Sequence, residues 1–302
     1  MGAIAIITDE PGWHGAQLKR AFAARGYEGH YVSLTECSFD LCDRSLIRIP
    51  GVHPALPLGA FVRGVPGGTL EQVVLRLDVL HGLRELGVPV YNDGRAIERT
   101  VDKALTSFLL KRRGVPTPDT WVIENEAAAR ALIARETAAG QPLVMKPLFG
   151  SQGLGITLIR GLSSLPDDPS GFGKVFYLQR FVESRDEEWR DWRVMVVGGR
   201  AIAVMQRRSR HWITNRAQGG RCIAVVLDRR LAQLAEASVR AIGIDYAGVD
   251  LLQDANGEFL VTEVNSIPAW WGLQAVCGFN IAERLVADFC ERLIAGGCRA
   301  VS

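Results

Sequence analysis

Short apolar runs alternate with amphipathic segments over the first hundred residues of the chain. Two of these segments, 15–25 and 70–86, carry apolar residues at helical spacing, and a glycine ends each of them. The apolar runs around them have the length of strands: 3–8, 31–34, 60–63 and 88–91. This alternation predicts β–α–β units and therefore a small open sheet with helices on its faces. Since no Gly-x-Gly-x-x-Gly sequence follows the first run, the pattern does not support a dinucleotide site there.

Beyond residue 97, strand-like runs follow one another, often without a helix between them. Apolar residues at helical spacing predict helices at 97–111, 127–139, 229–242 and 281–294. Shorter apolar runs predict strands at 121–123, 143–146, 155–159, 175–181, 192–197, 200–206, 222–226, 249–252 and 259–264. Consecutive strands are typical of antiparallel sheets. The sequence therefore predicts an α/β protein in which an open sheet is followed by α+β lobes.

The stretch from Asp250 to Asn265 carries the clearest chemical signal. Its turn, 254–257, joins two apolar strands. Because side chains alternate along a strand, Glu263 and Asn265 point to the same face, and a hairpin can bring Asp250 across to that face. Such an oxygen-only cluster suits Mg²⁺ or Mn²⁺, and a Mg²⁺ ion held by few protein groups usually carries substrate phosphates. The alternative is two surface acids around a turn, but burial would penalise polar side chains in an apolar strand.

Composition and charge are those of an ordinary globular protein. The chain has 302 residues, of which 48% are hydrophobic and 23% charged, and its net charge is +2. This balance argues against a strong polyanion-binding surface, and no apolar run reaches the length of about 18 residues that a membrane span needs. The start lacks the basic region of a signal peptide, and the cysteines form no Cys-x-x-Cys pair. We therefore expect a cytoplasmic protein with reduced thiols and no nucleic-acid or membrane partner.

A second signal is a glycine-rich loop that follows a strand ending in Lys146. Gly150, Gly153 and Gly155 would let backbone N–H groups close on phosphate oxygens, and the lysine adds a positive charge. The loop lacks the Gly-x-x-x-x-Gly-Lys-Ser/Thr order of a Walker A sequence. Taken alone, it is equally compatible with an ordinary flexible hairpin loop.

Arginines supply a third signal. Arg193 follows Asp191 at the head of a strand, and Arg207 lies in the arginine-rich stretch 206–210. A guanidinium fork suits carboxylate and phosphate oxygens, so these residues indicate a local anionic substrate site, with a solvated charged face as the alternative. The pair Asp102-Lys103, at the start of a helix, would by itself be only an ion pair on a helix surface.

Taken in order, these pieces resemble the ATP-grasp superfamily and, within it, the RimK-like amino-acid ligases. The resemblance covers about residues 88–290 and rests on seven segments: 102–103, 146–153, 179–182, 191–193, 215–220, 248–250 and 263–265. It implies an ATP-grasp fold with an N-terminal Rossmann-like pre-ATP-grasp domain at 1–97. A central lobe at 98–182 and a C-terminal lobe with the metal site at 183–302 would follow.

The resemblance also implies a nucleotide site. Lys103 and Lys146 match lysines that contact the phosphates, and Asp191 and Asn215 match residues on the ribose side and on the phosphate or metal side. The loop over the phosphates corresponds to Gly150, Ser151, Gln152 and Gly153, and the strand that reads adenine by its backbone corresponds to Gln179, Arg180, Phe181 and Val182. Arg180 departs from the family, in which glutamate is usual, and this puts a side-chain contact to the adenine amino group in doubt.

The implied reaction is the ATP-dependent joining of a carboxylate to an amine through an acyl phosphate. Arg193, Arg207 and Lys146 match its catalytic side chains, and Asp250, Glu263 and Asn265 match ligands of Mg²⁺ or Mn²⁺. Non-catalytic binding of ATP is the alternative of another class, and peptide-forming D-alanine ligation is the alternative within the superfamily. Family members often form homo-oligomers, but no exposed stripe in this sequence indicates one.

The sequence says less about the acceptor. The candidate substrate residues are Arg216, Gly219, Gly220, Trp270 and Trp271, and Trp13, His14 and Trp212 are further candidates on the acceptor side. Adjacent tryptophans could stack on a planar ring, or they could pack in the core. In the family, glutamate is added to coenzymes of the tetrahydromethanopterin and F420 type or to protein tails. The stretch around Trp270 favours L-glutamate on a small pterin-like acceptor, with a protein or peptide tail as the alternative.

Overall fold

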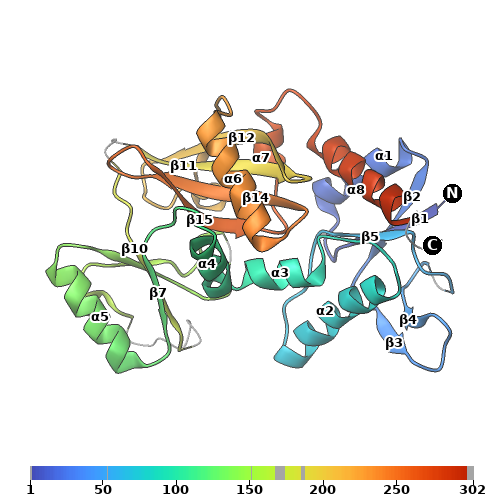
Figure 1. Cartoon of the computed structure of the whole chain (residues 1–302), viewed down its shortest axis with the longest axis horizontal. Helices are drawn as coiled ribbons and strands as arrows, with labels where there is room; N and C mark the ends of the chain where they lie inside the picture. Colours follow the sequence, from blue (N-terminus) through green and yellow to red (C-terminus); the bar gives the residue numbers. More distant parts are fainter. Residues whose placement is uncertain (1, 53, 151, 167–173, 185–187, 298–302) are drawn as a thin grey trace.

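The described residues form four sheets, and the three larger ones organise the chain. Figure 1 shows their arrangement. The computed structural model describes residues 2–52, 54–150, 152–166, 174–184 and 188–297. Ser151, which the sequence predicts over the phosphates, lies outside these residues. In the described part of the chain, no helix is long and apolar enough to cross a membrane.

The N-terminal sheet is parallel, as the β–α–β alternation predicts. Its strand order is β2(Tyr27–Val32), β1(Gly2–Ile7), β5(Gly59–Val62), β6(Val90–Tyr91). Side chains of β1 alternate between two cores: Ile4 and Ile6 pack with α1(Gly12–Ala23) and α8(Ile281–Gly297), and Ala5 and Ile7 pack with α2(Leu70–Glu85). Helices therefore cover both faces, and the last helix of the chain returns to the first sheet (Figure 1).

Two antiparallel sheets follow, and the site lies between them. The smaller one has the order β7(Thr120–Ile123), β10(Phe176–Arg180), β8(Leu143–Lys146), β9(Thr157–Ile159), and α5(Glu126–Ala138) packs on it. The larger one has the order β13(Arg221–Ala224), β12(Arg200–Ser209), β11(Trp189–Val197), β14(Tyr246–Gln253), β15(Phe259–Asn265). One face of the larger sheet packs on α6(Arg229–Ile242), which leaves the polar side chains of its other face for the cleft.

The helix expected at 97–111 is in fact two helices. α3(Gly94–Val101) ends before Asp102, and α4(Lys103–Arg112) begins after it. Asp102 has extended backbone angles, and its carboxylate accepts hydrogen bonds from the N–H groups of Ala104 and Leu105, at 2.8 and 3.1 Å. It is therefore an N-cap, which satisfies free donors at the start of a helix. The break directs Lys103 toward the cleft, a consequence that helical periodicity alone does not reveal.

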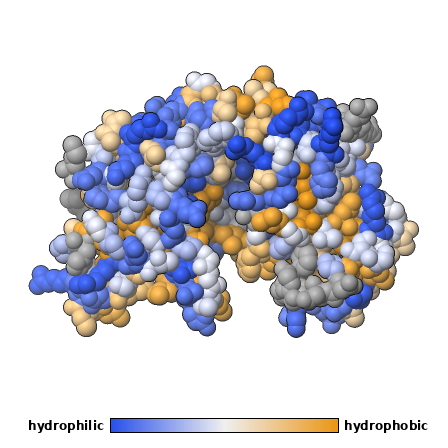
Figure 2. Space-filling view, turned by 180° about the vertical axis from the view of Figure 1, so that it is seen from behind, coloured by the Kyte–Doolittle hydropathy of each residue, from blue (hydrophilic) through white to orange (hydrophobic). Residues whose placement is uncertain are grey.

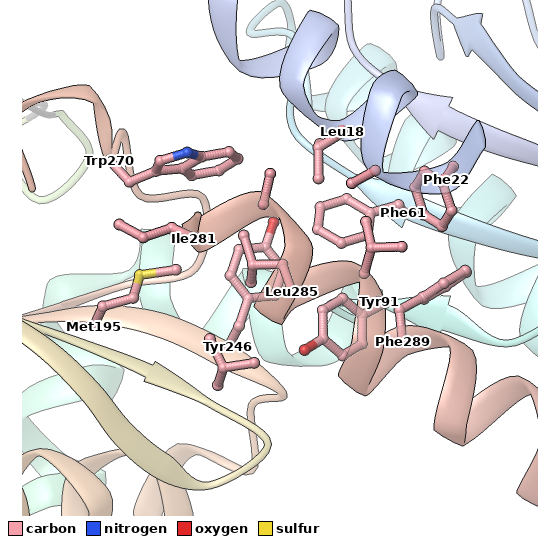
Figure 3. Close-up of a cluster of buried hydrophobic side chains, with 14 of the residues drawn as sticks. Leu18, Phe22, Phe61, Tyr91, Met195, Tyr246, Trp270, Ile281, Leu285 and Phe289 are labelled. Carbon is pink, nitrogen blue, oxygen red and sulfur yellow. The ribbon is translucent and has the colours of Figure 1, made fainter. Parts of the chain in front are cut away.

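A shared aromatic core joins the N-terminal sheet to the five-stranded sheet. Tyr91 and Tyr246 stack with ring centroids 5.1 Å apart, and Phe61 and Phe289 pack beside them (Figure 3). The buried Asn92 side chain adds hydrogen bonds to the backbone at both ends of this contact, donating to the carbonyls of Tyr246 and Ser266 at 2.8 and 2.7 Å. The segment that follows β15 is thus fixed against the N-terminal part of the molecule.

Other differences from the sequence prediction are local. The hairpin of β3(Ser38–Asp40) and β4(Leu46–Arg48) was not expected, and β2 begins at Tyr27, ahead of the expected 31–34. Short elements also escaped the pattern: α7(Trp271–Gln274) and the 3-10 helix η3(Arg216–Gln218). These elements hold too few residues to show a hydrophobic period.

The domain boundaries at 97 and 182 stay predictions. From behind, Figure 2 shows a notch at the lower edge, between the part that contains α2 and the part that contains α5.

Candidate active site

A cleft lies between the four-stranded antiparallel sheet and the polar face of the five-stranded sheet. Together with the solvent at its open mouth, the space in the cleft is about 1020 Å³. Most of the nucleotide, catalytic and metal-site residues predicted from the sequence line it: Lys103, Lys146, Gly150, Gln152, Gly153, Gln179, Arg180, Phe181, Val182, Asp191, Arg207, Asn215, Asp250 and Glu263. Segments separated by up to 160 residues are thus brought to one cavity, although their individual roles stay predictions.

One end of the cleft is aromatic. The ring of Phe181 lies 5.4 Å from that of Trp189 and 5.7 Å from that of Trp212, and apolar side chains complete the walls: Val144, Ile156 and Leu252. In the described chain, the N–H of Val182 donates no hydrogen bond. Flat apolar walls beside a free backbone donor suit a planar heterocycle. Trp189 was missed, and Trp212 was expected on the acceptor side, because neither residue carries a motif.

Arg180 is held by the protein itself. Its guanidinium donates to Asp119 and Glu136, at 2.8 and 2.7 Å, and it lies over the ring of Trp121. The side-chain hydrogen bond from Arg180, followed by the one from Arg135, lowers the pKa of Glu136. These contacts explain how the departure from glutamate is accommodated. The side chain is used in structural ion pairs, which leaves the backbone of the strand to face the cleft.

Two lysines and one acid form the polar end of the cleft. The Nζ of Lys146 donates to Oε1 of Gln179 at 2.7 Å, and the Nζ of Lys103 donates to the carbonyl of Gly150 at 2.7 Å. Burial lowers the pKa of Lys146 to about 8, and the nearby charge of Glu263 only partly offsets this. Burial also lowers the pKa of Lys103. An anion placed between these lysines would favour their charged forms.

If a nucleotide binds beside Lys146, as the resemblance implies, its affinity should depend on pH. Its pKa of about 8 means that the charge is present below this pH and is lost as the pH rises through it. We expect the affinity for ATP to fall by up to about tenfold per pH unit above 8, since an anion binds the protonated form. Calorimetric titrations between about pH 7 and 9 would measure this. Lys146→Arg, which keeps its charge, should abolish the fall. An equal fall in both proteins would contradict the role of Lys146.

The glycine loop reaches across the cleft to the segment that precedes β13. A Cβ atom on Gly153 would lie 2.8 Å from Cγ2 of Ile213 and 2.9 Å from Oδ1 of Asn215, and the φ angle of Gly153 is +75°. Both the close approach and the positive φ require glycine at this position. The loop can therefore cover the cleft and touch Asn215 only if residue 153 has no side chain.

Gly153→Ala should impair closure of this loop. The added methyl group meets Ile213 and Asn215, and the positive φ strains alanine. We expect ATP-dependent turnover to fall by about tenfold or more, with little change in the melting temperature because the loop is at the surface. Gly140→Ala is a matched control, since Gly140 also has a positive φ (+72°) but has open space around it. Equal activities of the two variants would contradict the closure role.

Four charged side chains form a buried network on the floor of the cleft. Arg207 pairs with both oxygens of Asp191 and lies 3.1 Å from Asp250, whose carboxylate also accepts two hydrogen bonds from Arg193, at 2.7 and 2.6 Å. Burial by itself would raise the pKa of Asp250, but Arg193 and Arg207 lower it to about 2. Strand register explains the network, because Arg207 is opposite Asp191, and Arg193 is opposite Asp250.

The three predicted metal ligands share one face, as expected. Asp250 is directly opposite Glu263, and Asn265 follows two residues later on the same strand. Glu263 forms no hydrogen bond or ion pair within the described residues, and Asn265 uses its amide N–H group on the carbonyl of Gly248 and keeps its Oδ1 free. Asp250, by contrast, is engaged by two arginines. Glu263 and Asn265 are therefore the two members of the set with oxygens available for a hard cation. Among the described residues, no group of three His, Cys, Asp or Glu side chains is arranged to hold a metal ion.

A second cavity adjoins the cleft and shares Gln152, Arg207, Asn215 and Glu263 with it. Its remaining lining residues come from five segments of the chain: His14, Arg193, Met205, Arg216, Ala217, Asn265, Ile267, Pro268, Ala269, Trp271 and Gly272. Glu263 is the acid common to both cavities. A reaction that passes a group from one bound molecule to another would occur where the two cavities meet.

Some predicted substrate residues lie elsewhere. Trp270 is only 1% exposed and packs in the shared core (Figure 3). Its ring contacts those of Trp13 and His14. It therefore does not wall the second cavity, in contrast to Trp271. Gly220 is buried against the carbonyl of Thr214, and Gly219 lies by a separate recess with Arg208 and Arg221. The glycine pair thus shapes the turn after η3 and lines neither of the two joined cavities.

Comparisons with known proteins agree with this geometry. A family model described as RimK-like ATP-grasp domain matches residues 100–289. The tetrahydromethanopterin:alpha-L-glutamate ligase of Methanococcus maripaludis is 36% identical over 235 residues, which are 76% of this chain and 77% of that protein. A Trichodesmium erythraeum protein named probable alpha-L-glutamate ligase is 29% identical over 300 residues, 97% of each. The solved structure of the ATP-grasp ligase PsnB complexed with minimal precursor has a TM-score of 0.72 at 19% identity, over 97% of this chain and 98% of that one.

The fold, with its cleft between two antiparallel sheets, is that of ATP-grasp proteins, and the family model and the curated relatives make the chain an ATP-grasp ligase. More narrowly, the chain belongs to the RimK-like ATP-grasp family. The resemblance, the fold and the ligase class that the order of motifs predicts are therefore confirmed.

Proposed function

We propose that this protein uses ATP to join L-glutamate to a small, pterin-like acceptor through an amide bond. The observation that carries this proposal is the pair of cavities that meet at Gln152, Arg207, Asn215 and Glu263. One cavity has the aromatic and cationic ends that a nucleotide requires, and the other is open to a second molecule. The identity of the substrates is supported by the relative from M. maripaludis, whose name specifies glutamate and tetrahydromethanopterin.

In the proposed binding mode, the base lies between the aromatic walls at Phe181 and Trp212, and the phosphates lie near Lys103 and Lys146. Glu263 and Asn265 would hold Mg²⁺ or Mn²⁺. When bound, the cation neutralises charge on the phosphate oxygens, which otherwise repels an anionic nucleophile. The two lysines supply further positive charge, and Lys146 is positioned for this by its hydrogen bond to Gln179.

The proposed reaction has two steps. An oxygen of the acceptor carboxylate bonds to the γ-phosphorus of ATP as the bond to the bridging oxygen breaks, which gives an acyl phosphate and ADP. The glutamate nitrogen, as a neutral amine, then attacks the acyl carbon, the bond from that carbon to the phosphate oxygen breaks, and the proton from nitrogen passes to the phosphate that leaves. Arg207 lies where the cavities meet and Arg193 lies in the second one, so both can stabilise the transferring phosphoryl group. The glycine loop excludes water, which would otherwise hydrolyse the acyl phosphate.

The test is an ADP-release assay with a panel of amino acids and two groups of acceptors, pterins that carry a carboxylate and peptides. Mass spectrometry identifies the product. We expect ADP release that requires both L-glutamate and a pterin, and a product heavier by one or more glutamyl residues. Modification of peptides only would replace the pterin by a protein tail as acceptor. Release with D-alanine alone would indicate peptide-forming ligation, and either result would contradict the proposal.

A further inference from the structure

Arg216 and Trp271 form a stack on the wall of the second cavity. The guanidinium carbon of Arg216 lies 3.9 Å from the ring centroid of Trp271, and the indole is 45% exposed. Arg216 begins η3 directly after Asn215, and Trp271 begins α7. A guanidinium on an aromatic face keeps the N–H groups at its edge available as donors. The stack therefore orients a fork of donors on the wall of the second cavity.

Arg216 is the arginine of this cavity without an acidic partner. Arg193 and Arg207, the other arginines that line it, are paired with Asp250 and Asp191. The side chain of Arg216 forms no hydrogen bond or ion pair within the described residues. The charges of the first two are thus compensated by the protein. The guanidinium of Arg216, in contrast, has no such compensation among the described residues, so its positive charge is available to an anionic ligand.

His14, on the same cavity, does not provide this charge. Its Nε2 accepts a hydrogen bond from the backbone N–H of Trp270 at 3.1 Å, so the ring is neutral with its proton on Nδ1. Burial, followed by the charge of Arg63, lowers the pKa of His14 to about 4. His14 can therefore donate a hydrogen bond to a ligand, but Arg216 is the residue that can offer an uncompensated charge.

The surrounding packing builds the stack. A Cβ atom on Gly272 would lie 2.8 Å from the Sγ of Cys222 and 3.5 Å from the Cδ of Arg216. Glycine at this position lets α7 lie directly against β13, and this contact brings Trp271 beneath Arg216. The stack thus depends on tight contact between two elements.

We propose that the Arg216–Trp271 stack binds a free carboxylate of the amino-acid substrate. This inference rests on the proposed function only for the identity of that substrate. The recognised chemistry is a carboxylate that is not phosphorylated, either on the side chain of glutamate or on its α-carbon. Its position next to Asn215 places the amino acid beside the junction of the two cavities.

The test is calorimetric titration of the protein, saturated with Mg²⁺ and a non-hydrolysable ATP analogue, with L-glutamate and with L-glutamine. Arg216→Met should weaken glutamate binding at least tenfold, because a charge-assisted hydrogen bond is lost. Arg221→Met is the matched control, since Arg221 is exposed on the neighbouring strand and pairs with Glu188. It should bind glutamate like the wild type. Trp271→Phe should keep the platform, whereas Trp271→Ala should weaken binding in the same direction as Arg216→Met.

The glutamine arm distinguishes the two carboxylates. If Arg216→Met weakens glutamate binding alone, the stack binds the side-chain carboxylate, and if it weakens both, the stack binds the α-carboxylate. Glutamate binding by Arg216→Met within twofold of the Arg221→Met control, or no glutamate binding by the wild type, overturns the inference. Weakened binding by Arg216→Met, without any glutamate-dependent ADP release by the wild type, would overturn the proposed function and leave the carboxylate site standing.

Discussion

Glu263→Gln is expected to lower ATP-dependent turnover by about a hundredfold or more, with no loss of stability. The physical reason is that Glu263 faces both cavities and lies near Lys103 and Lys146, yet forms no hydrogen bond or ion pair within the described chain. Its charge therefore contributes little that folding requires, whereas a cation and a polyphosphate depend on it. Rates of ADP release and melting temperatures of both proteins would measure the effect.

Glu258→Gln is the control for this variant. Glu258 precedes the same strand but is exposed, and it pairs with Arg230 at 2.7 Å on the surface. It should keep wild-type turnover. If Glu263→Gln also releases ADP at close to the wild-type rate, Glu263 is not a metal ligand, and the assignment of this end of the cleft is wrong.

Arg207→Met is expected to destabilise the protein by about 3–5 kcal/mol. The guanidinium is 3% exposed and pairs with two carboxylates, Asp191 and Asp250, which are themselves buried. Its removal takes away the ion pair of Asp191 and leaves Asp250 paired with Arg193, in an environment where an unpaired charge is costly. The free energy of unfolding, from urea denaturation followed by fluorescence, would give the value.

The matched control is Arg230→Met, which breaks an ion pair with Glu258 whose side chains are 55% and 67% exposed. An exposed pair contributes at most about 1 kcal/mol. Both variants lose an ion pair, but only the pair of Arg207 is buried. The difference between their losses in free energy of unfolding therefore measures the effect of burial. Equal losses, both within about 1 kcal/mol, would mean that the network is solvated and does not hold the floor of the cleft.

The strand pairing of the site could be predicted only within the last hairpin. Side-chain alternation places Glu263 and Asn265 on one face, and the structure has Asp250 opposite Glu263. The pairing of Arg193 with Asp250 joins strands 57 residues apart, and no local pattern fixes their register. For this reason the sequence suggests Asp250 as a metal ligand and Arg193 as a phosphate ligand, but it cannot reveal that the two side chains bind each other.

The acceptor side was the least predictable part. The sequence does not show which of two adjacent tryptophans faces a substrate. The packing of the shared core buries Trp270 and leaves Trp271 at the cavity. Similarly, Arg216 becomes informative only because Trp271, 55 residues later, lies beneath it. Long-range packing decides both cases, and neither helical nor strand periodicity reports it.

The central claim is that a carboxylate of the acceptor is activated by ATP before the amine attacks. The most direct test uses an acceptor whose carboxylate is labelled with ¹⁸O, together with ATP and L-glutamate, and mass spectrometry of the released phosphate. The account predicts ADP as the nucleotide product and one labelled oxygen in the phosphate, because the acyl carbon leaves that oxygen behind when the amide forms. Unlabelled phosphate, or AMP with pyrophosphate as products, would contradict it.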